Sequence, residues 1–413
     1  MATGEVTDEA PGDGSGAPAV AARPGRLSGV DATRGLALLG MMSVHVLPTV
    51  DPDGSASTAQ LIAGGRFAAT FAVLAGVGLA LSTGGTRPLG RRSWGEHAWA
   101  IVVRAVAIGS IGLGLGYPEA RVVVILPYYA LLFLVALPVL PLRTHPLAML
   151  GVGAAVLVPP MSFLLRGELE PWVFSNPTFS TLVEEPGDLV VTLVLTGEYP
   201  VLAWTAYLFA GMAMGRLPLR SVRVAAGLLV VGAAVALGAT ALSELLLGPL
   251  GGLDRLAEVT GSPGGAAGLE AALETNKSGN VSTDTWWWLA VDTPHSSTPL
   301  DLLHTTGVAV ALLGTLLLVS RSRVGAWLLA PLAAAGSMTL SLYTGHVLLL
   351  SSGWLPDDPM TSYRYQVLGV LVVAVGWRAL FARGPIEAVI AVLAGRGKMI
   401  RWTFRCRTDR FST

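Results

Sequence analysis

The stretch Arg26–Pro48, RLSGVDATRGLALLGMMSVHVLP, decides the fold class predicted for this chain. It opens with charged residues, continues into about twenty mostly apolar residues, and keeps one histidine, His45, near its far end. A helix turns by roughly 100° per residue, so Asp31, Arg34 and His45 share one face, and His45 lies roughly 16 Å deeper than Arg34. The stretch therefore predicts a membrane helix whose one face joins a charged entrance to a buried imidazole.

The composition of the whole chain is that of a membrane protein. Hydrophobic residues make up 52% of the 413 residues and charged residues only 13%, and glycine is abundant, as in packed membrane helices. The formal net charge of zero says nothing about nucleic-acid or acidic partners, because in a membrane protein the placement of charge matters more than its total. The single cysteine, Cys406, excludes an intrachain disulfide.

Apolar segments long enough to span a bilayer recur along the chain. We expect an all-α polytopic membrane protein with about ten transmembrane helices. The predicted spans lie near residues 30–50, 62–82, 97–116, 122–140, 147–165, 199–215, 224–247, 301–320, 327–350 and 366–382. Several of them are short or flanked by proline, so the count is predicted to within one or two.

Three regions follow from this pattern. Residues 1–25 are mostly Gly, Ala, Asp, Glu and Pro without apolar periodicity, which predicts a disordered cytoplasmic tail. Residues 26–383 form the membrane domain, with two long outer loops at about 166–198 and 248–300. Residues 384–413 predict an amphipathic helix on the inner membrane surface, followed by a basic cytoplasmic tail.

Basic residues set the predicted orientation. With the N-terminus inside, most arginines fall on the inner connections or next to them, among them Arg34, Arg91, Arg92, Arg143 and Arg216. Acidic residues gather mainly in the outer loops, although they influence topology less. Both termini are therefore expected to be cytoplasmic.

Polar residues near the outer ends of the predicted spans indicate a shared pocket. These residues are His45, Glu198, Asp301, His304, Tyr343 and His346. Asp301 and His304 are three positions apart, as are Tyr343 and His346, so each pair lies on one helical face. Because polar groups in lipid are costly unless they face a cavity or one another, the six residues predict a polar site under the outer leaflet.

Each of these features also has a purely structural interpretation. A histidine near a helix end can be satisfied by water or a backbone carbonyl, Asp31 and Arg34 can form an ion pair at a helix start, and Arg91 with Arg92 can serve topology alone. The three tryptophans at 286–288 can anchor a loop at the membrane interface or line the mouth of a site. The candidate histidines suit a metal, but no tight spacing motif supports a metal site, and none is predicted.

The opening stretch also carries a family resemblance. From Arg26 to His45 it reads R-x4-D-x2-RG-x2-L-x2-M-x3-H, which resembles the first helix of the transmembrane acyltransferases. These comprise the acyltransferase-3 proteins, the heparan-alpha-glucosaminide N-acetyltransferase catalytic domain and the bacterial DUF418/YeiB-like proteins. Four later runs resemble YeiB-like helices in the same order: RFAATFAVLAGVGLALS, AYLFAGMAMGRL, AAGSMTLSLYTGHVLLL and WRALFARGPIEAVI.

Two departures limit what this resemblance carries over. Many YeiB-like proteins have asparagine where this chain has His45, and in the heparan enzyme the catalytic histidine lies in a luminal loop after the motif. A catalytic role for His45 therefore follows the acyltransferase-3 pattern. The long outer loop with three tryptophans matches neither group, so the acceptor cannot be carried over.

The resemblance implies transfer of an acyl group, with acetyl expected, from cytoplasmic acyl-CoA to a hydroxyl or amine of an extracytoplasmic sugar or glycolipid. This places the protein in the inner (plasma) membrane of a cell with an envelope glycan. The expected partners are the lipid bilayer and an envelope acceptor, and no nucleic acid is expected. His45 would act as general base or acyl carrier, Asp301 or Glu198 would orient its ring, and His304 or Tyr343 would donate to the oxyanion. His346 completes the candidate catalytic set. The CoA phosphates would bind near Asp31, within a basic set of Arg34, Arg91, Arg92, Arg143 and Arg216.

Two other classes of function remain compatible with the sequence. A transporter or flippase of an envelope precursor would also keep polar groups and broken helices inside the membrane, and a non-catalytic scaffold would tolerate the aromatic loop and amphipathic tail. A deep cavity beneath His45, open to the cytoplasm, would favour the enzyme. A central cavity with two gates would favour the transporter, and a filled bundle the scaffold. The sequence does not decide whether the protein forms a homo-oligomer.

Overall fold

The computed structural model describes residues 27–395, except positions 119, 121, 171–172 and 276–278 and the side chains of Arg91 and Arg92. Over these residues the chain is helical, and its only extended pairing is the isolated bridge between Val50 and Ala56. The predicted all-α class is therefore confirmed. The predicted tails before residue 26 and after residue 395 lie outside the described residues.

The helices follow one another closely along the chain. In order they are α1 (Ser28–Val46), α2 (Thr58–Ala63), α3 (Arg66–Ser82), α4 (Arg91–Gly114), α5 (Leu126–Val135), α6 (Thr144–Arg166), α7 (Phe179–Glu184), α8 (Pro186–Val191), α9 (Val201–Gly215), α10 (Val222–Leu247), α11 (Gly252–Thr260), α12 (Gly265–Thr275), α13 (Pro299–Val319), α14 (Arg323–Leu328), α15 (Ala330–Gly336), α16 (Thr339–Leu350), α17 (Pro359–Leu380) and α18 (Pro385–Leu393). A π-helical turn, η2 (Thr192–Thr196), follows α8, and a 3₁₀ turn, η3 (Trp286–Ala290), follows α12.

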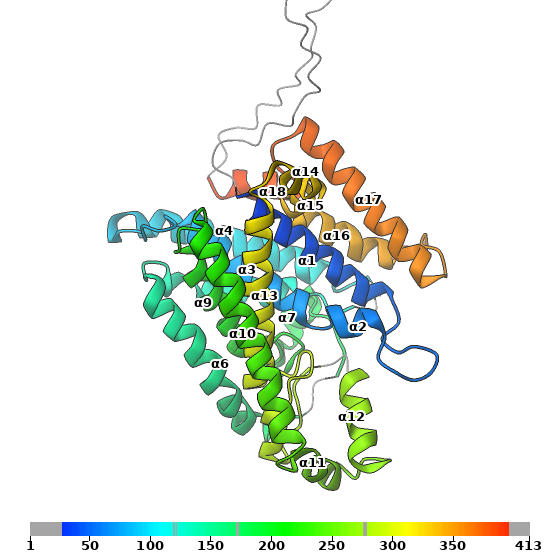
Figure 1. The fold of residues 1–413 in the computed structure, drawn as a ribbon. Coiled ribbons are helices and arrows are strands. Elements are labelled where there is room, and N and C mark those ends of the chain that lie inside the picture. The colour runs from blue at the N-terminus through cyan, green and yellow to red at the C-terminus, as the bar shows by residue number, and fades with distance from the viewer. Residues whose placement is uncertain (1–26, 119, 121, 171–172, 276–278, 396–413) are drawn as a thin grey trace, which may run out of the picture.

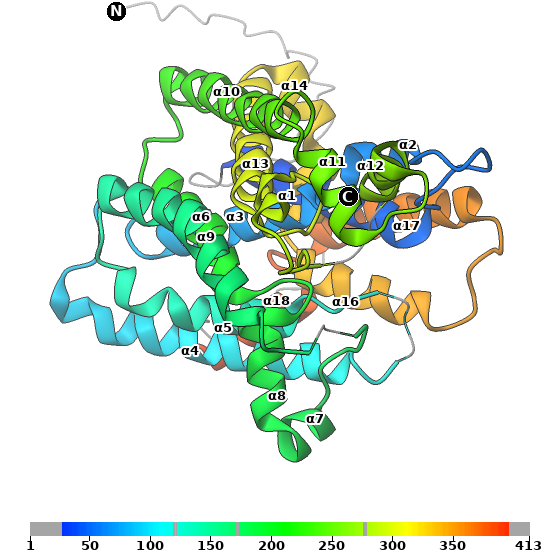
Figure 2. The same cartoon turned by 90° about the horizontal axis from the view of Figure 1, so that it is seen from below.

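The long helices pack side by side into one bundle, with α6 and α9 on one side and α16 and α17 on the other (Figures 1 and 2). The pairs with the most extensive contact are α10 with α13, α3 with α9, α1 with α15, and α6 with α9. Small residues make this packing close: a side chain at Gly232 on α10 would collide with the α13 backbone at Ala311, and one at Gly76 on α3 with the α9 backbone at Leu208. Backbones can approach this closely in a membrane bundle only where such residues meet.

Five helices are long and apolar enough to cross a membrane: α2 with α3, α4, α6, α10 and α13. The number rises to eight if each of three bent pairs is one span, namely α8 and η2 with α9, α15 with α16, and α17 with α18. The predicted count of about ten is not confirmed. The first predicted span, now α1, is missing from this set because Asp31, Arg34 and His45 lower its hydropathy, and α5 is only 10 residues long.

The two ends of the bundle differ in structure. Helices α11 and α12 with η3 form a small folded cap at one end, whereas the first residues of α1 and helix α18 lie at the other (Figure 1). The cap has its own apolar core, including Leu256, Leu269 and Trp288. The tryptophans take separate roles: the Trp288 indole donates to the Asp284 carboxylate at 2.7 Å, while the exposed Trp286 stacks on Phe163.

Candidate active site

Helix α1 lines two cavities, one after the other along its length. Arg34 and Met41 face an inner cavity of about 620 Å³ near α18, and Val44 and His45 face an outer cavity of about 610 Å³ beneath the cap. Seven residues, two helical turns, separate Arg34 from Met41, and four residues, one further turn, separate Met41 from His45. One face of α1 therefore runs past both cavities, as the pattern of its polar residues predicts.

A short segment of backbone separates the two cavities. Val122 and Val123 line the outer cavity, whereas Ile125 and Leu126, at the start of α5, line the inner one. The Tyr343 hydroxyl lines the inner cavity and accepts a hydrogen bond from the Ile125 backbone N–H at 3.4 Å. The partition is thus only a few residues thick.

His45 and His346 meet at the level of this partition. The distance between His45 Nδ1 and His346 Nε2 is 3.0 Å. His45 is half-buried in the wall of the outer cavity, while His346, on α16, is 3% exposed. On its other side the His346 Nδ1 lies 2.7 Å from Oε1 of Gln366, which comes from α17. Helix α1 therefore meets the consecutive helices α16 and α17 at this pair, although His45 and His346 are 301 positions apart in the chain.

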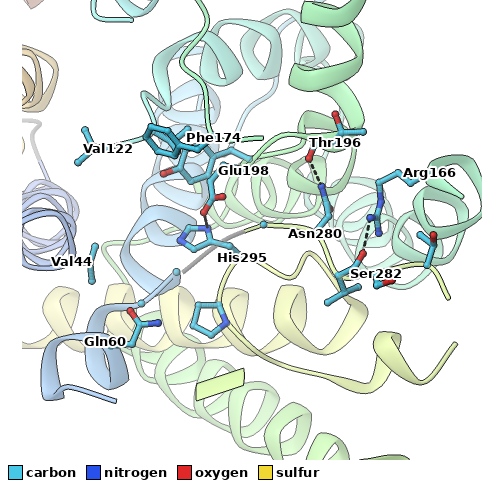
Figure 3. Close-up of a pocket in the computed structure, with 18 of the residues that line it drawn as sticks. Val44, Gln60, Val122, Arg166, Phe174, Thr196, Glu198, Asn280, Ser282 and His295 are labelled. Atoms are coloured by element: carbon cyan, nitrogen blue, oxygen red, sulfur yellow. Dashed lines mark hydrogen bonds and ion pairs between the residues drawn. The ribbon is translucent and has the colours of Figure 1, made fainter. Parts of the chain in front are cut away.

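A histidine–carboxyl pair also lines the outer cavity. His295 Nδ1 is 3.7 Å from Glu198 Oε1, and both side chains are largely buried (Figure 3). His295 takes a left-handed backbone conformation, with φ of 62°, in the loop before α13. Burial lowers the pKa of the His295 imidazole from its ordinary 6.5 to about 4, so the ring is uncharged at neutral pH.

Hydrogen bonds to backbone carbonyls hold the far wall of the outer cavity. The Asn280 side-chain amide donates to three consecutive carbonyls at the end of η2, the shortest being 2.9 Å to Thr196 (Figure 3). Arg166, at the end of α6, donates to the Val281 carbonyl at 2.7 Å. Phe174 adds an aromatic ring to the same cavity. The wall thus combines polar side chains with an aromatic surface.

The inner cavity is mainly apolar but carries three arginines. Arg34 pairs with Asp31 at 3.5 Å and donates to the Leu74 carbonyl at 3.2 Å. Arg104 lies near the middle of α4, with its guanidinium 5.3 Å from the centre of the Phe133 ring, and Arg383 precedes α18. A cation in the middle of an apolar helix is costly in lipid, so Arg104 indicates a polar or charged content for this cavity.

Helix α18 closes one end of the inner cavity. Its Glu387 carboxylate accepts hydrogen bonds from the backbone N–H groups of Leu340, at 2.9 Å, and Ser341, at 3.2 Å. These groups belong to the first turn of α16, whose N–H groups have no helical partner because the chain bends by 82° between α15 and α16. The C-terminal helix is therefore anchored to the helix that carries Tyr343 and His346.

Two of the predicted catalytic residues lie in another group. The Asp301 carboxylate accepts from the Ser297 backbone at 2.9 Å, at the start of α13. Arg66 Nε donates to His304 Nε2 at 3.2 Å, so His304 Nδ1 carries the proton and donates to the Thr240 hydroxyl at 2.8 Å. Both ring nitrogens of His304 are thus occupied by packing partners. The six residues predicted to share one pocket are therefore divided: His45 and Glu198 line the outer cavity, Tyr343 lines the inner cavity, His346 is buried behind His45, and Asp301 and His304 belong to this cluster.

The predicted phosphate-binding arginines are also divided. Arg34 lines the inner cavity, as described above. Arg216 is 3% exposed and donates to the carbonyls of Ala80, Thr83 and Leu140, which fastens α9 to neighbouring segments. Arg143 is exposed where α6 begins. The side chains of Arg91 and Arg92 lie outside the described part of the structure.

Several residues at these cavities were not among the sequence candidates: Arg104, His295, Gln366, Arg383 and Glu387. For Arg104 the signal was present, because it is a charged residue inside an apolar run, whereas Gln366 stands at the first position of a predicted span. For His295 there was none, since the loop around it has no periodicity. Among the described residues, no group of three or more His, Cys, Asp or Glu side chains could hold a metal ion.

A sequence comparison identifies the family of this chain. The family model described as heparan-alpha-glucosaminide N-acetyltransferase, catalytic, matches residues 26–244, more than half of the chain. The chain belongs to this family. The predicted resemblance to the transmembrane acyltransferases is therefore confirmed. No curated protein matches the chain.

Membership of the heparan-alpha-glucosaminide N-acetyltransferase catalytic family makes this chain a member of a membrane acetyltransferase family. The matched region contains Arg34, His45, Arg104 and Glu198. It ends within α10, so His346, which contacts His45, comes from the part of the chain beyond the match. The family match thus includes His45 but not His346, and only the tertiary structure brings the two together.

Proposed function

We propose that this protein transfers an acetyl group from acetyl-CoA, bound from the cytoplasm, to a hydroxyl or amine of a sugar or glycolipid on the outer side of the inner (plasma) membrane. The observation that carries the proposal is that one face of α1 lines two cavities in succession, with His45 where they approach each other. Donor and acceptor would enter from opposite sides, and neither would have to cross.

The inner cavity suits the donor. CoA carries several phosphates, and Arg34, Arg104 and Arg383 supply positive charge in the same cavity. The remaining wall is largely apolar, with side chains such as Ile101 and Phe133, and suits the uncharged pantetheine arm. The thioester would then lie beside Tyr343, one helical turn from His346.

The outer cavity suits a sugar. Gln60, Glu198, Asn280 and His295 supply hydrogen-bonding groups, and Phe174 supplies an apolar face against which a sugar ring can pack. The name of the family refers to a glucosaminide, whose amine is a nucleophile when uncharged. A glucosaminide is therefore the first acceptor to test, with an envelope glycan or glycolipid as the natural one.

The reaction needs one group to move a proton. His45, as an uncharged imidazole, would take the proton from the acceptor while the acceptor oxygen or nitrogen attacks the thioester carbonyl carbon. The Tyr343 hydroxyl, from the residue that lines the inner cavity, would donate to the oxyanion. Collapse of the adduct breaks the carbon–sulfur bond, and the thiolate leaves as CoA with the proton held by His45. In the alternative route through an acylated His45, His45 attacks the thioester and releases the CoA thiolate, and the acceptor then takes the acetyl group from His45 and gives up its proton.

The experiment that tests this proposal uses purified protein in lipid nanodiscs with radiolabelled acetyl-CoA and methyl α-glucosaminide. Label is expected to appear on the sugar, with release of one CoA thiol per acetyl group. In cells, mass spectra of envelope lipids and glycans with and without the protein should differ by one acetyl group in a single class of molecule. Absence of acetyl-CoA binding to the purified protein would contradict the proposal.

One observation favours a second candidate function. Two cavities separated by a thin partition are also expected of a transporter with an inner and an outer gate. Such a protein would move a glycolipid between leaflets of a vesicle without acetyl-CoA, and His45→Ala would leave that movement unchanged. Two cavities of this size argue against a scaffold with a filled bundle.

A further inference from the structure

The side chain of Gln366 ends a hydrogen-bonded chain that starts at His45. Along this chain, His45 Nδ1 lies 3.0 Å from His346 Nε2, and His346 Nδ1 lies 2.7 Å from Gln366 Oε1. The Gln366 amide nitrogen in turn donates to the Ser362 hydroxyl at 3.3 Å. Gln366 and Ser362 are 4% exposed, so water does not compete for these groups.

The two histidine rings meet edge to edge. Their planes differ by only 10°, and their centroids are 5.3 Å apart while the facing nitrogens are 3.0 Å apart. This geometry places the in-plane lone pair of one nitrogen on the line of the other ring's N–H. The contact is therefore a ring-to-ring hydrogen bond, with exactly one proton between the two nitrogens.

The direction of the chain follows from its far end. In the structure the Gln366 amide turns its oxygen toward His346 and its nitrogen toward the Ser362 hydroxyl, and an amide oxygen can only accept. His346 Nδ1 therefore carries a proton. His346 is 3% exposed, and its two ring nitrogens face the Gln366 amide oxygen and His45, neither of which is an anion. Burial therefore favours the neutral ring, whose Nε2 lone pair accepts from His45 Nδ1.

We infer that His346 and Gln366 are positioning residues that hold His45 in the tautomer with its proton on Nδ1 and its lone pair on Nε2. The nitrogen turned away from His346 is then the one able to take a proton from the acceptor or to attack the thioester. Once Nε2 is protonated, the imidazolium keeps its Nδ1–H bond to a neutral His346, which stabilises the charge. The tautomer itself does not depend on the proposed function. Only the role of the Nε2 lone pair in acetyl transfer rests on that proposal.

The tautomer can be measured without any assay of activity. Solid-state NMR of protein labelled with ¹⁵N-histidine, with the His45 signals assigned by their loss in His45→Asn, should show a pyridine-type Nε2 and a pyrrole-type Nδ1. In Gln366→Leu, which keeps the side-chain volume but removes the acceptor, both tautomers should appear. A pyridine-type Nδ1 for His45 in the wild-type protein would overturn the inference.

Kinetics provide the second test, with acetyl-CoA and methyl α-glucosaminide as substrates. Gln366→Leu should lower kcat by about 10- to 100-fold at unchanged KM, the usual effect of losing a partner that fixes a histidine tautomer. Gln366→Glu retains an acceptor oxygen and should keep kcat within about threefold of the wild type. A wild-type kcat for Gln366→Leu would contradict the inference, as would a large loss in Gln366→Glu.

A matched control lies on the same helix. The Tyr363 hydroxyl donates to the Leu39 carbonyl at 3.2 Å and so also joins α17 to α1, without touching the histidine chain. Tyr363→Phe should leave both kcat and the His45 tautomer unchanged. If Gln366→Leu fails to fold, Ser362→Ala tests the inference instead. This variant frees the Gln366 amide to rotate and should lower kcat severalfold. An unchanged kcat in Ser362→Ala would count against the inference. A wild-type protein that shows the expected tautomer but no acetyl transfer would refute the proposed function alone.

Discussion

His45 on α1 and His346 on α16 are 301 positions apart in the chain, yet their facing ring nitrogens are 3.0 Å apart. The contact joins the helix that lines both cavities to the second arm of a helix pair bent by 82°. A bend of this kind exposes backbone groups that must be satisfied, and Glu387 satisfies them from α18. The candidate site therefore depends on the fold of the last helices as much as on the first.

Replacing His45 by alanine should abolish acetyl transfer while membrane insertion and thermal stability stay near wild type. The expected loss in kcat is about 10²- to 10⁴-fold, the contribution of a general base. His145→Ala, at an exposed position on α6, is the control and should be silent. A purified His45→Ala protein with normal turnover would remove the residue from the mechanism.

Removing the arginines of the inner cavity should weaken the binding of acetyl-CoA. Arg34→Ala and Arg104→Ala should each raise Kd by about tenfold, because each loses one charge-assisted contact to phosphate. Calorimetric titration in nanodiscs measures this effect. Arg143→Ala is the comparison, since Arg143 is exposed away from the cavity; if it weakens binding as strongly, the nucleotide lies elsewhere.

The anchor of α18 should contribute to stability. Glu387→Ala removes the carboxylate that caps α16 and should cost about 2 kcal/mol, with a lower midpoint of thermal unfolding and faster proteolysis between α17 and α18. Glu387→Gln, which keeps an acceptor oxygen, should lose less. Equal stability of all three proteins would show that the cap does not hold α18.

The buried imidazole of His295 should make stability depend on pH. Its pKa is lowered to about 4 in the folded protein, against 6.5 when unfolded, so the unfolded state binds the proton first as the pH falls. The contribution of the neutral His295 ring to stability is therefore fully present above about pH 6.5 and is lost progressively toward pH 4, by about 3 kcal/mol. Thermal unfolding across this range should be flatter in His295→Gln; an identical slope in both proteins would contradict the assignment.

The predicted orientation can be tested with reporter fusions. Thr86, between α3 and α4, should report the cytoplasm, and Ser262, between α11 and α12 in the cap, the outer side. Parallel fusions at Arg220, in the connection between α9 and α10, should agree with Thr86. The same side for Thr86 and Ser262 would require a different topology.

The sequence alone determined the class of protein and the layout of its first helix. Apolar runs of sufficient length indicate membrane helices whatever their partners, and the 3.6-residue period places Arg34 and His45 on one face of α1. The motif around them also indicated the family, and the match to residues 26–244 confirms it. These features are local, because they depend only on residues within one helix.

The tertiary structure alone decided which polar residues meet. Periodicity cannot tell which helix faces His45, and His304 looked as good a partner as His346 until packing placed it beside Arg66 and Thr240. The number of spans also depended on where helices bend, as between α15 and α16. The physical reason is that contacts between helices are set by close approach at small residues such as Gly232 and Gly76, and pairing at such distances along the chain leaves no periodic signal in the sequence.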